Sequence, residues 1–584
     1  MSYYDEASLV FIPSGYKTSK AYSIKPTSGD GDLAFTRSND TASRIGPDGL
    51  IEKVRTNRLL QSNTFNTTWT LTDASVTIGQ SGYDGTSNAW LLNVTAGTGS
   101  QRVEQSIVSS TLSTYSVYLK AGTTDWVALR ATGSPVNCLV WFDLSTGTKG
   151  ANQNATNYTI TSVGSGWYRC TLTTTTTIDK VYIYPATADD IAGLNCTSGD
   201  NILIQAAQLE SGDVMTDYIA TTTAAVSVGP VANVPRLDYL NSSCPRLLLE
   251  PQRTNTRTNS ENATGSNWGA PTGVDITANQ IASPDGYVSA DLIAATSASV
   301  NHIFEQTFSA TSATAFTYSY FAKANTNNQC FIYGFSDNGV FALQTAIFNL
   351  TNGTIVSNTG GGTASIVDYG NGWYRVSLTL TANATATGYW GIGLAKNGAR
   401  QWTSDGTSIY MWGIQLETGA YATSYIPTLG AAVTRGADNA SKTSASAIIG
   451  QTEGTMFWEF ERGAAGFDYF QLNGGSASNW ILLGIDGSNF LAFINNGGVN
   501  QVNILTSLSS GTHKAAFAYK NNDCVLYLDG VQIGTDTSAS IPATSVIRLG
   551  GPDTSSAREI TAYTSQAILF PTRLQNSDLA ALTA

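Results

Sequence analysis

Few side chains in this sequence could act as a general base, because its 584 residues include only two histidines. A Ser-His-Asp or Cys-His site needs a histidine beside its nucleophile. His302 lies in VNHIFEQTF and His513 opens a predicted strand in GTHKAAFAY. We expect both to be structural histidines in surface or strand positions. No GxSxG, P-loop, HExxH or EF-hand pattern occurs either, so the motifs point away from an enzyme.

One pair of carboxylates, Glu459 and Glu461 in MFWEFER, has a spacing that could support hydrolysis. Residues two apart on a strand share a face, and retaining glycosidases place two carboxyl groups about 5 Å apart. Phe460 stands between the two glutamates and Arg462 follows them. We expect solvent-facing strand glutamates here and keep glycoside hydrolysis as the alternative.

Saccharide binding would use other side chains, because aromatic rings stack on the apolar side of a pyranose while polar groups fix its hydroxyls. Among the 12 Trp residues, Trp402 follows the turn NGAR and precedes TSDG, which predicts a loop position. Arg400 and Asp405 lie close to it in sequence and could bond a sugar. Trp480, in SASNWILLG, starts a predicted strand after a loop. These four residues are the candidate glycan contacts.

The composition indicates what kind of scaffold positions these residues. Charged residues make up 12% of the chain, about half the usual share. Gly (56 residues), Thr, Ser and Asn fill the difference. Such a composition is typical of strands and tight turns rather than of helices. The sequence therefore predicts an all-β protein.

Charge and hydropathy exclude several functions. The formal net charge of −12, a pI near 4.7 and the absence of a Lys/Arg run argue against nucleic-acid binding. No window of about 20 apolar residues could cross a membrane. The start, MSYYDEASLV, lacks the features of a signal peptide, so we expect any release to use another route, such as cell lysis. The six cysteines lack zinc-like spacing and are expected to be buried thiols, with a Cys138–Cys170 disulfide left open.

The chain contains two copies of one domain. SGWYRCTLTT (165–174) returns as NGWYRVSLTL (371–380), and the QLE segment at 202–221 returns at 409–428. The separations are nearly constant, at 206 residues for the tryptophan of GWYR and 207 for the leucine of QLE. Ordered matches at a constant separation indicate duplication. The equivalent tryptophans, Trp167 and Trp373, are expected in the cores.

Each copy shows the period of two that marks half-buried strands. In FTYSYFAK (316–323), alternate residues from Phe316 to Ala322 share one face, and WYRVSLTL (373–380) alternates likewise. Turn signals such as GNG and SDG separate the runs. Short strands punctuated in this way predict a β-sandwich or jelly roll.

The last part of the chain differs from both copies. It contains one hairpin signal, with Asp529-Gly530 at the turn of CVLYLDGVQIG. Asn576 or Ser577 is expected to cap a short helix over DLAAL. The other predicted strands are GTMFWEFER (454–462), HKAAFAYK (513–520) and VIRLGG (546–551).

Several of these segments resemble known families. HKAAFAYK, CVLYLDGVQIG and IRLGG resemble the laminin-G/pentraxin-like branch of the concanavalin A-like sandwiches. The two copies, marked by GWYR and QLE, resemble carbohydrate-binding-module-like jelly rolls. Residues 12–54 and 233–255 resemble a segment of tailed-bacteriophage structural proteins, in which the two pieces usually run together. The first jelly roll is therefore read as an insertion between them.

The resemblance also bears on catalytic residues, on cofactors and on the division of the chain into regions. Glucanases of the concanavalin A-like fold carry acids on one strand, but their Asp between two Glu is missing around Glu459 and Glu461. The resemblance leaves calcium open although no acidic cluster marks a site, and no other cofactor is expected. The expected regions are a 1–55 attachment segment, a 56–228 jelly roll, a 229–440 linking segment with the second jelly roll, and a 441–584 lectin domain.

The resemblance implies a virion fibre, spike or capsid decoration that displays glycan-binding modules on the virion surface. The expected partners are a host-surface glycan, other virion proteins and further copies of the chain, most simply in a homotrimer. A polysaccharide-degrading hydrolase and a bacterial surface adhesin are the alternatives. The sequence does not identify the glycan, head or tail placement, or the end that attaches.

Overall fold

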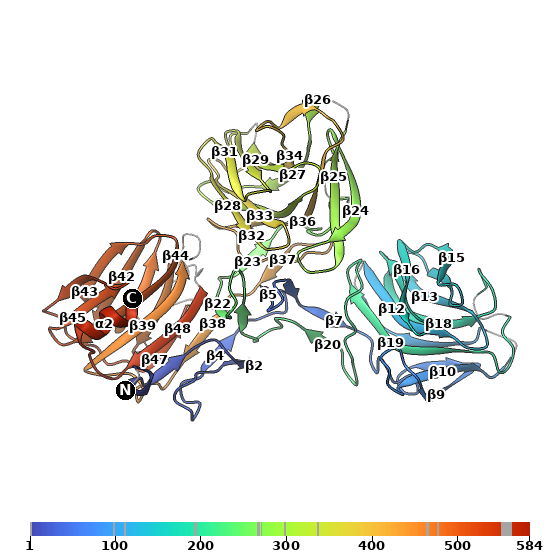
Figure 1. Cartoon of the computed structure of the whole chain (residues 1–584), viewed down its shortest axis with the longest axis horizontal. Helices are drawn as coiled ribbons and strands as arrows, with labels where there is room; N and C mark the ends of the chain where they lie inside the picture. Colours follow the sequence, from blue (N-terminus) through green and yellow to red (C-terminus); the bar gives the residue numbers. More distant parts are fainter. Residues whose placement is uncertain are drawn as a thin grey trace. The chain divides into compact units, whose positions relative to one another are not determined.

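The structure, a computed structural model, consists almost entirely of strands, which confirms the all-β prediction of tandem sandwiches. Its two helices among the described residues, α1 (Tyr3–Glu6) and α2 (Asn576–Thr583), are short, and neither could cross a membrane. The chain forms two compact units, Val54–Gly229 and Met1–Lys53 with Pro230–Ala584 (Figure 1). The described residues are 3–96, 100–109, 112–191, 195–264, 269, 271–296, 299–335, 338–462, 467–475, 478–550 and 563–584.

The unit Val54–Gly229, called module 1, is a sandwich of two six-stranded antiparallel sheets. Apolar residues of both sheets, such as Val117 and Leu129, form one core between them. The first sheet has the order β16 (Asn157–Gly164), β17 (Trp167–Thr174), β12 (Ser113–Ala121), β19 (Asn201–Ser211), β10 (Ala89–Val94), β9 (Ala74–Gln80). The second has the order β15 (Thr148–Gln153), β14 (Cys138–Asp143), β13 (Trp126–Ser134), β18 (Thr177–Ala186), β11 (Arg102–Ser106), β8 (Thr70–Thr72).

A second sandwich, called module 2, lies between β23 (Arg253–Asn255) and β37 (Val433–Arg435). Its first sheet has the order β32 (Thr363–Asp368), β33 (Trp373–Thr381), β28 (Ala315–Ala324), β36 (Ser408–Thr418), β25 (Val288–Ala295), β24 (Val274–Ala282). The second has the order β31 (Thr354–Thr359), β30 (Gln344–Asn349), β29 (Gln329–Phe335), β34 (Thr387–Leu394), β27 (Ile303–Ser309). A short pair joins β26 (Ser299–Asn301) to β35 (Gln401–Thr403).

The two modules share one strand order. The six strands of the first sheets follow each other in the same sequence, with the GWYR strand second from the edge in both. The second sheets agree over five strands, and module 1 adds β8 at the edge. Alternate residues from Phe316 to Ala322 lie in the core of module 2, as the pattern of FTYSYFAK predicts. Duplication of one domain would produce this agreement.

Each module is entered and left through a pair of adjacent strands. In module 1, β7 (Arg55–Asn57) pairs with β20 (Val226–Val228), and β23 pairs with β37 at the base of module 2. A buried asparagine, Asn57 or Asn255, ends the incoming strand, and its amide makes the same four main-chain hydrogen bonds in both modules. The partners are Ala207 O, Ile219 O, Leu59 N and Leu209 N for Asn57, and Ile414 O, Ile426 O, Arg257 N and Leu416 N for Asn255.

The polar residues of the repeated motifs are structural. The GWYR arginine of module 1, Arg169, donates to Thr216 O (2.6 Å), and Glu210 of QLE accepts from Thr216 N (2.9 Å). In module 2, Arg375 and Glu417 hold Thr423 in the same way, and all four charged side chains are buried. These motifs therefore fix the loop after the QLE strand.

The C-terminal sandwich consists of two larger sheets, A and B, around one core. Sheet A has the order β21 (Arg236–Asp238), β22 (Arg246–Leu248), β48 (Tyr563–Phe570), β39 (Glu453–Arg462), β44 (Gly511–Lys520), β45 (Cys524–Leu528), β46 (Val531–Asp536), with β1 (Leu9–Phe11) also on β48. Sheet B has the order β2 (Tyr16–Lys17), β3 (Lys20–Ala21), β4 (Leu33–Thr36), β38 (Asn439–Lys442), β47 (Val546–Leu549), β40 (Phe467–Asn473), β41 (Trp480–Asp486), β42 (Asn489–Asn496), β43 (Val499–Ser507).

Local predictions for this sandwich hold in part. The hairpin β45–β46 turns at Asp529-Gly530 as expected. Helix α2 begins at Asn576, but the expected cap is wrong, because Gln575 is the N-cap residue and makes no side-chain capping bond. The helix is instead held by packing, since Leu579 is buried against Ala516 of β44 and its neighbours.

The N-terminal residues form part of the C-terminal sandwich. Strand β1 pairs with β48 of sheet A and β4 pairs with β38 of sheet B. Leu9, Phe11 and Phe35 are buried in the sandwich core. The segment is too short for a core of its own, and these three residues are buried within the same chain, whereas Tyr22 and Ile24 are exposed.

The hairpin of β5 (Ser43–Ile45) and β6 (Ile51–Lys53) covers the outer face of the first sheet of module 2. Its residues Ile45 and Ile51 pack there with Trp373. The expected core position of Trp373 is therefore wrong in detail: the side chain is buried, but outside the space between the two sheets. Trp167 is buried on the same outer face of module 1, beside Tyr118.

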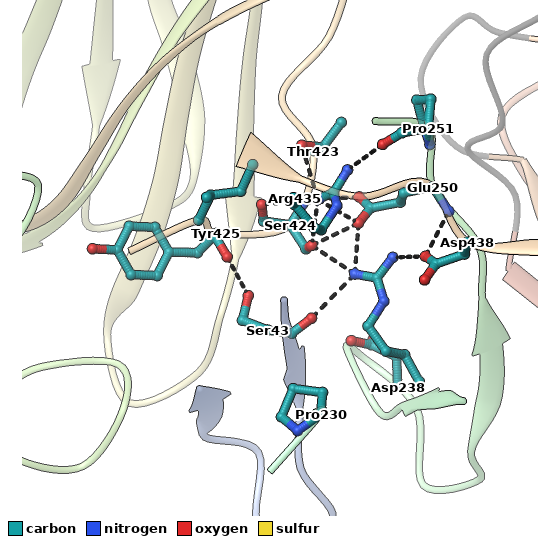
Figure 2. A network of polar contacts seen from close by, with 12 residues as sticks. Ser43, Pro230, Asp238, Glu250, Pro251, Thr423, Ser424, Tyr425, Arg435 and Asp438 are labelled. Atoms are coloured by element: carbon teal, nitrogen blue, oxygen red, sulfur yellow. Dashed lines mark hydrogen bonds and ion pairs between the residues drawn. The ribbon is translucent and has the colours of Figure 1, made fainter. Parts of the chain in front are cut away.

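A buried network of charges joins residues 12–54 and 233–255 of the chain (Figure 2). Arg236 pairs with Glu250 and Asp438, and Arg435 pairs with Glu250 (2.8 Å). Arg37 reaches the other oxygen of Asp438 (3.0 Å). These side chains are at most 7% exposed. Residues that the sequence separates by module 1 thus meet in one structural joint.

Candidate glycan-binding faces

Each sandwich has a cluster of aromatic and apolar side chains on the outer face of one sheet, separate from its core. Alternation along strands places such residues on the side opposite the core. The clusters are Trp126, Leu139, Trp141, Tyr182 and Tyr184 on the second sheet of module 1, Ile303, Phe331, Tyr333, Phe335 and Ile347 on the second sheet of module 2, and Tyr469, Trp480, Leu482, Leu491 and Phe493 on sheet B.

The face of module 1 combines aromatic rings with charge. Strand pairing sets Glu104, Tyr182 and Arg130 in one row, and the guanidiniums of Arg102 and Arg130 lie 5.8 and 5.5 Å from the Tyr182 ring centre. Arg102 Nε (2.5 Å) and Lys180 Nζ (3.2 Å) donate to Glu104. Burial alone would raise the pKa of Glu104, but these two donors hold it below its ordinary value.

The side chains of the predicted trio of module 2 have different partners. Arg400 covers the outer cluster, with its guanidinium 4.9 Å from the centre of Tyr333. Trp402 is half-buried in β35 rather than on a loop, and it stacks at 3.9 Å on His302 at the edge of the core. Asp405 is exposed and pairs with Lys396, whose hydrogen bond lowers the pKa of the carboxyl. The trio separates because β35 pairs with β26 and holds Trp402 against His302.

Trp480 lies on the outer face of sheet B, at the start of β41 as predicted. Its ring stacks on Phe493, with centres 4.6 Å apart and planes 22° apart. Strand pairing places the amides of Asn473 and Asn495 on either side of it, and Asn473 Nδ2 donates to Gln471 Oε1 (3.1 Å). A half-buried aromatic pair flanked by amides can stack a sugar ring and bond its hydroxyls.

The module 1 face is not apparent from single tryptophans in the sequence, because several strands contribute to it. The residues of this face come from four strands, β11, β13, β14 and β18, which lie between Arg102 and Ala186 in the sequence. One signal was present: aromatic residues alternate in VYIYPA at 181–186, and the charged residue Arg130 stands in a strand with Trp126 on the same face.

Glu459 and Glu461 are half-buried on β39, away from the core that Trp458 and Phe460 enter. Glu461 is not simply solvent-facing, because it forms an ion pair with Arg246. It also lines a cavity of about 450 Å³. The ion pair with Arg246 therefore already engages one of the two carboxylates that hydrolysis would need.

Both histidines are buried. His513 lies in strand β44, which is the strand alternative of the expectation. His302 is fully buried, and burial lowers its pKa. His513 Nδ1 lies 2.6 Å from Asp529 Oδ2, and Ser509 Oγ lies 3.3 Å from His513 Nε2, which is the contact order of a triad. Nε2 is equally close to the Ser509 carbonyl (3.2 Å), however, and Asp529 also accepts from Lys514 N at the hairpin. The contacts of His513, Asp529 and Ser509 therefore stabilise the β45–β46 turn.

Metal and disulfide chemistry have little support in the part of the chain that the structure describes. No group of three or more His, Cys, Asp or Glu side chains there could hold a metal ion. All six cysteines are free, including Cys138 and Cys170, and only Cys244 is exposed.

Comparison with known proteins gives only distant likenesses. No known protein family and no curated protein matches the sequence. A Ruminococcus gnavus sialidase module, CBM40 bound to sialyllactose, is 16% identical over 24% of this chain and 87% of its own, with a TM-score of 0.22. Mouse laminin α1 domains LG4-5 are 13% identical over 47% and 89%, with a TM-score of 0.19. The Paenibacillus barcinonensis CBM22 tandem is 10% identical over 66% and 100%, with a TM-score of 0.20. Scores this low carry no argument about function.

Proposed function

We propose that this chain is a structural protein of a virion, a fibre, spike or capsid decoration, that displays glycan-binding β-sandwiches to the host surface. The observation that carries the binding function is the aromatic cluster on the outer face of one sheet in each of the three sandwiches. Most of these rings are buried, but Trp126, Phe335, Trp480 and Phe493 are half-buried. A half-buried aromatic ring with polar neighbours suits a sugar ring.

The virion role is supported by the resemblance of residues 12–54 and 233–255 to phage segments and by how those residues fold. They contribute strands to both sheets of the C-terminal sandwich and the buried network around Arg236. Module 1 interrupts them between two paired strands, as an inserted domain would. We therefore place the chain on the virion surface, with other virion proteins as partners.

Two measurements on the full chain test the proposal. Peptide mass spectrometry of purified virus particles should find this chain at a stoichiometry of several copies per particle. The purified protein should bind surface polysaccharide isolated from the host. A chain absent from particles would remove the virion role, and a chain that retains no polysaccharide would remove the adhesive one.

The hydrolase alternative is tested in the same samples. Binding without release of oligosaccharides is expected, because the carboxylate of Glu461 is held by Arg246. Oligosaccharide release that is lost on Glu459→Gln would instead support a hydrolase.

We also propose a homotrimer, because several weak sugar sites on one particle raise avidity roughly 10²- to 10⁴-fold. Light scattering of the full chain tests it, and a monomer at all concentrations would refute it.

A further inference from the structure

We propose that the outer face of the second sheet of module 1 selects an acidic saccharide, one that bears a carboxylate or sulfate group. This inference rests on the proposed glycan-binding function and specifies the ligand of one of its faces. It concerns Arg102, Arg130 and Lys180, which gather around Tyr182 on a chain whose formal net charge is −12.

Arg130 is the residue of this face that we expect to bind the acidic group. Its guanidinium lies over the Tyr182 ring at 5.5 Å and donates a hydrogen bond to the Tyr184 hydroxyl. Burial raises the pKa of Tyr184. No ion pair joins Arg130 to a carboxylate among the residues that the structure describes, whereas Arg102 and Lys180 both pair with Glu104. A half-exposed guanidinium held beside aromatic rings is pre-organised to bind a carboxylate or sulfate through two parallel hydrogen bonds.

The carboxylates near this face already have partners. Two of them lie beside Lys180 and two face the edge strand β15, where each accepts a hydrogen bond. These contacts are Glu104 with Arg102 and Lys180, Asp179 with Thr132 Oγ1 (2.5 Å), Asp189 with Ala151 N (2.7 Å) and Asp190 with Gln153 Nε2 (2.9 Å). A fifth, Asp143 of β14, stands opposite Trp126 and accepts from Ser145 and Thr146. Because the two nearest carboxylates face three cations, the region around Tyr182 keeps an excess positive charge.

The duplicate module supplies an internal comparison. Leu129 pairs with Ile183 in module 1 as Ile332 pairs with Ile392 in module 2, and this register aligns the two outer faces. Module 2 keeps the glutamate but lacks the three cations. The aligned pairs are Glu104 with Glu305, Arg102 with Ile303, Arg130 with Tyr333, Lys180 with Tyr389 and Tyr182 with Gly391.

Module 2 compensates its glutamate with a single cation from a loop. Arg400 lies over Tyr333 and interacts with Glu305, so the face is close to neutral. The two copies have therefore diverged in charge while keeping one strand order, which is what two different ligands would require.

The experiment measures binding of the full chain to a galacturonate tetramer, a sulfated tetrasaccharide and the methyl ester of the galacturonate tetramer, which lacks the charge. The wild type should prefer the acidic forms. Arg130→Gln should weaken acidic binding roughly tenfold or more and leave the ester unchanged. Arg130→Lys, which keeps the charge but loses the planar fork, should fall between the two.

The matched control is Lys120→Gln, which removes one positive charge from the opposite sheet of the same module. It should leave all three affinities unchanged. Raising ionic strength from about 0.05 M to about 0.5 M should weaken acidic binding in the wild type more than in Arg130→Gln. Unchanged unfolding of module 1 in Arg130→Gln shows that the variant is folded.

Equal wild-type affinity for acidic and methylated forms would overturn the inference but leave glycan binding standing. Equal losses in Arg130→Gln and Lys120→Gln would also overturn it, because the effect would be one of overall charge. Failure of the chain to bind any saccharide, including host polysaccharide, would refute the proposed function together with the inference.

Discussion

Replacing Glu250 by Gln removes one negative charge from the buried joint of Figure 2 and keeps the shape of the side chain. Glu250 accepts from Arg236 (2.6 Å), Arg435 (2.8 Å) and the N–H and hydroxyl of Ser424 (both 2.6 Å). Without its charge, Arg236 and Arg435 would lose the carboxylate that they share, and Asp438 would remain paired with Arg236 and Arg37. Breaking a buried ion pair on one side costs about 3–5 kcal/mol, and we expect that loss in the free energy of unfolding.

Urea unfolding of the full chain is the assay, because the two compact units should give separate transitions. Glu250→Gln should shift only the transition of the unit that contains residues 1–53 and 230–584. The matched control is Glu52→Gln, since Glu52 makes a half-exposed pair with Arg44 that is worth about 0–1 kcal/mol. Equal shifts in the two variants, or a shift in the module 1 transition, would refute the assignment of the network as the joint.

The same variant has a defined pH dependence. Burial alone would raise the pKa of Glu250, but Arg435 and Arg236 hold it far below its ordinary value of 4.5. The unfolded chain therefore takes up a proton before the native one does, and the stabilisation is complete above about pH 5 and is lost as pH falls below about 4.5. The stability difference between wild type and Glu250→Gln should shrink over that range. A constant difference from about pH 7 to pH 3 would contradict the charge-based argument.

Three further predictions use the same unfolding and binding assays. Trp167→Ala and Trp373→Ala should each cost about 3–5 kcal/mol in its own unit, because both side chains are buried; an unchanged transition would contradict the packing. Asn57→Ala and Asn255→Ala should each cost about 3 kcal/mol or more by leaving main-chain groups unpaired, and a surface-like loss below about 0.5 kcal/mol would contradict this. Trp480→Ala should weaken neutral-saccharide binding roughly tenfold while costing only about 1 kcal/mol of stability; unchanged binding would remove the sheet B face as a site.

Local patterns predicted much of the scaffold. Alternation placed Val376 and Leu378 in the core of module 2, and it placed Trp373 on the opposite face, which the expectation of a core tryptophan overlooked. The turn at Asp529-Gly530 was predictable because the residue types select that turn. The cap of α2 was not, because packing of Leu579 rather than a capping bond holds the helix.

The candidate sites were less predictable than the strands. Trp480 was found because it opens a strand after a loop, a local property. Arg400, Trp402 and Asp405 have different partners because neighbours in sequence on an irregular segment point in different directions. The row of Glu104, Tyr182 and Arg130 depends on the register of three strands, which no local pattern specifies.

The sequence by itself determined the strands, their turns and the duplication, since each follows from residue types a few positions apart or from repeated motifs. Only the tertiary structure decided that residues 9–36 complete the C-terminal sandwich and that Arg37, Arg236 and Asp438 meet in one joint. It also decided which tryptophans lie on outer faces. The physical reason is that long-range pairing and burial depend on which sheets come together, and alternation along one strand marks two faces without saying what covers either.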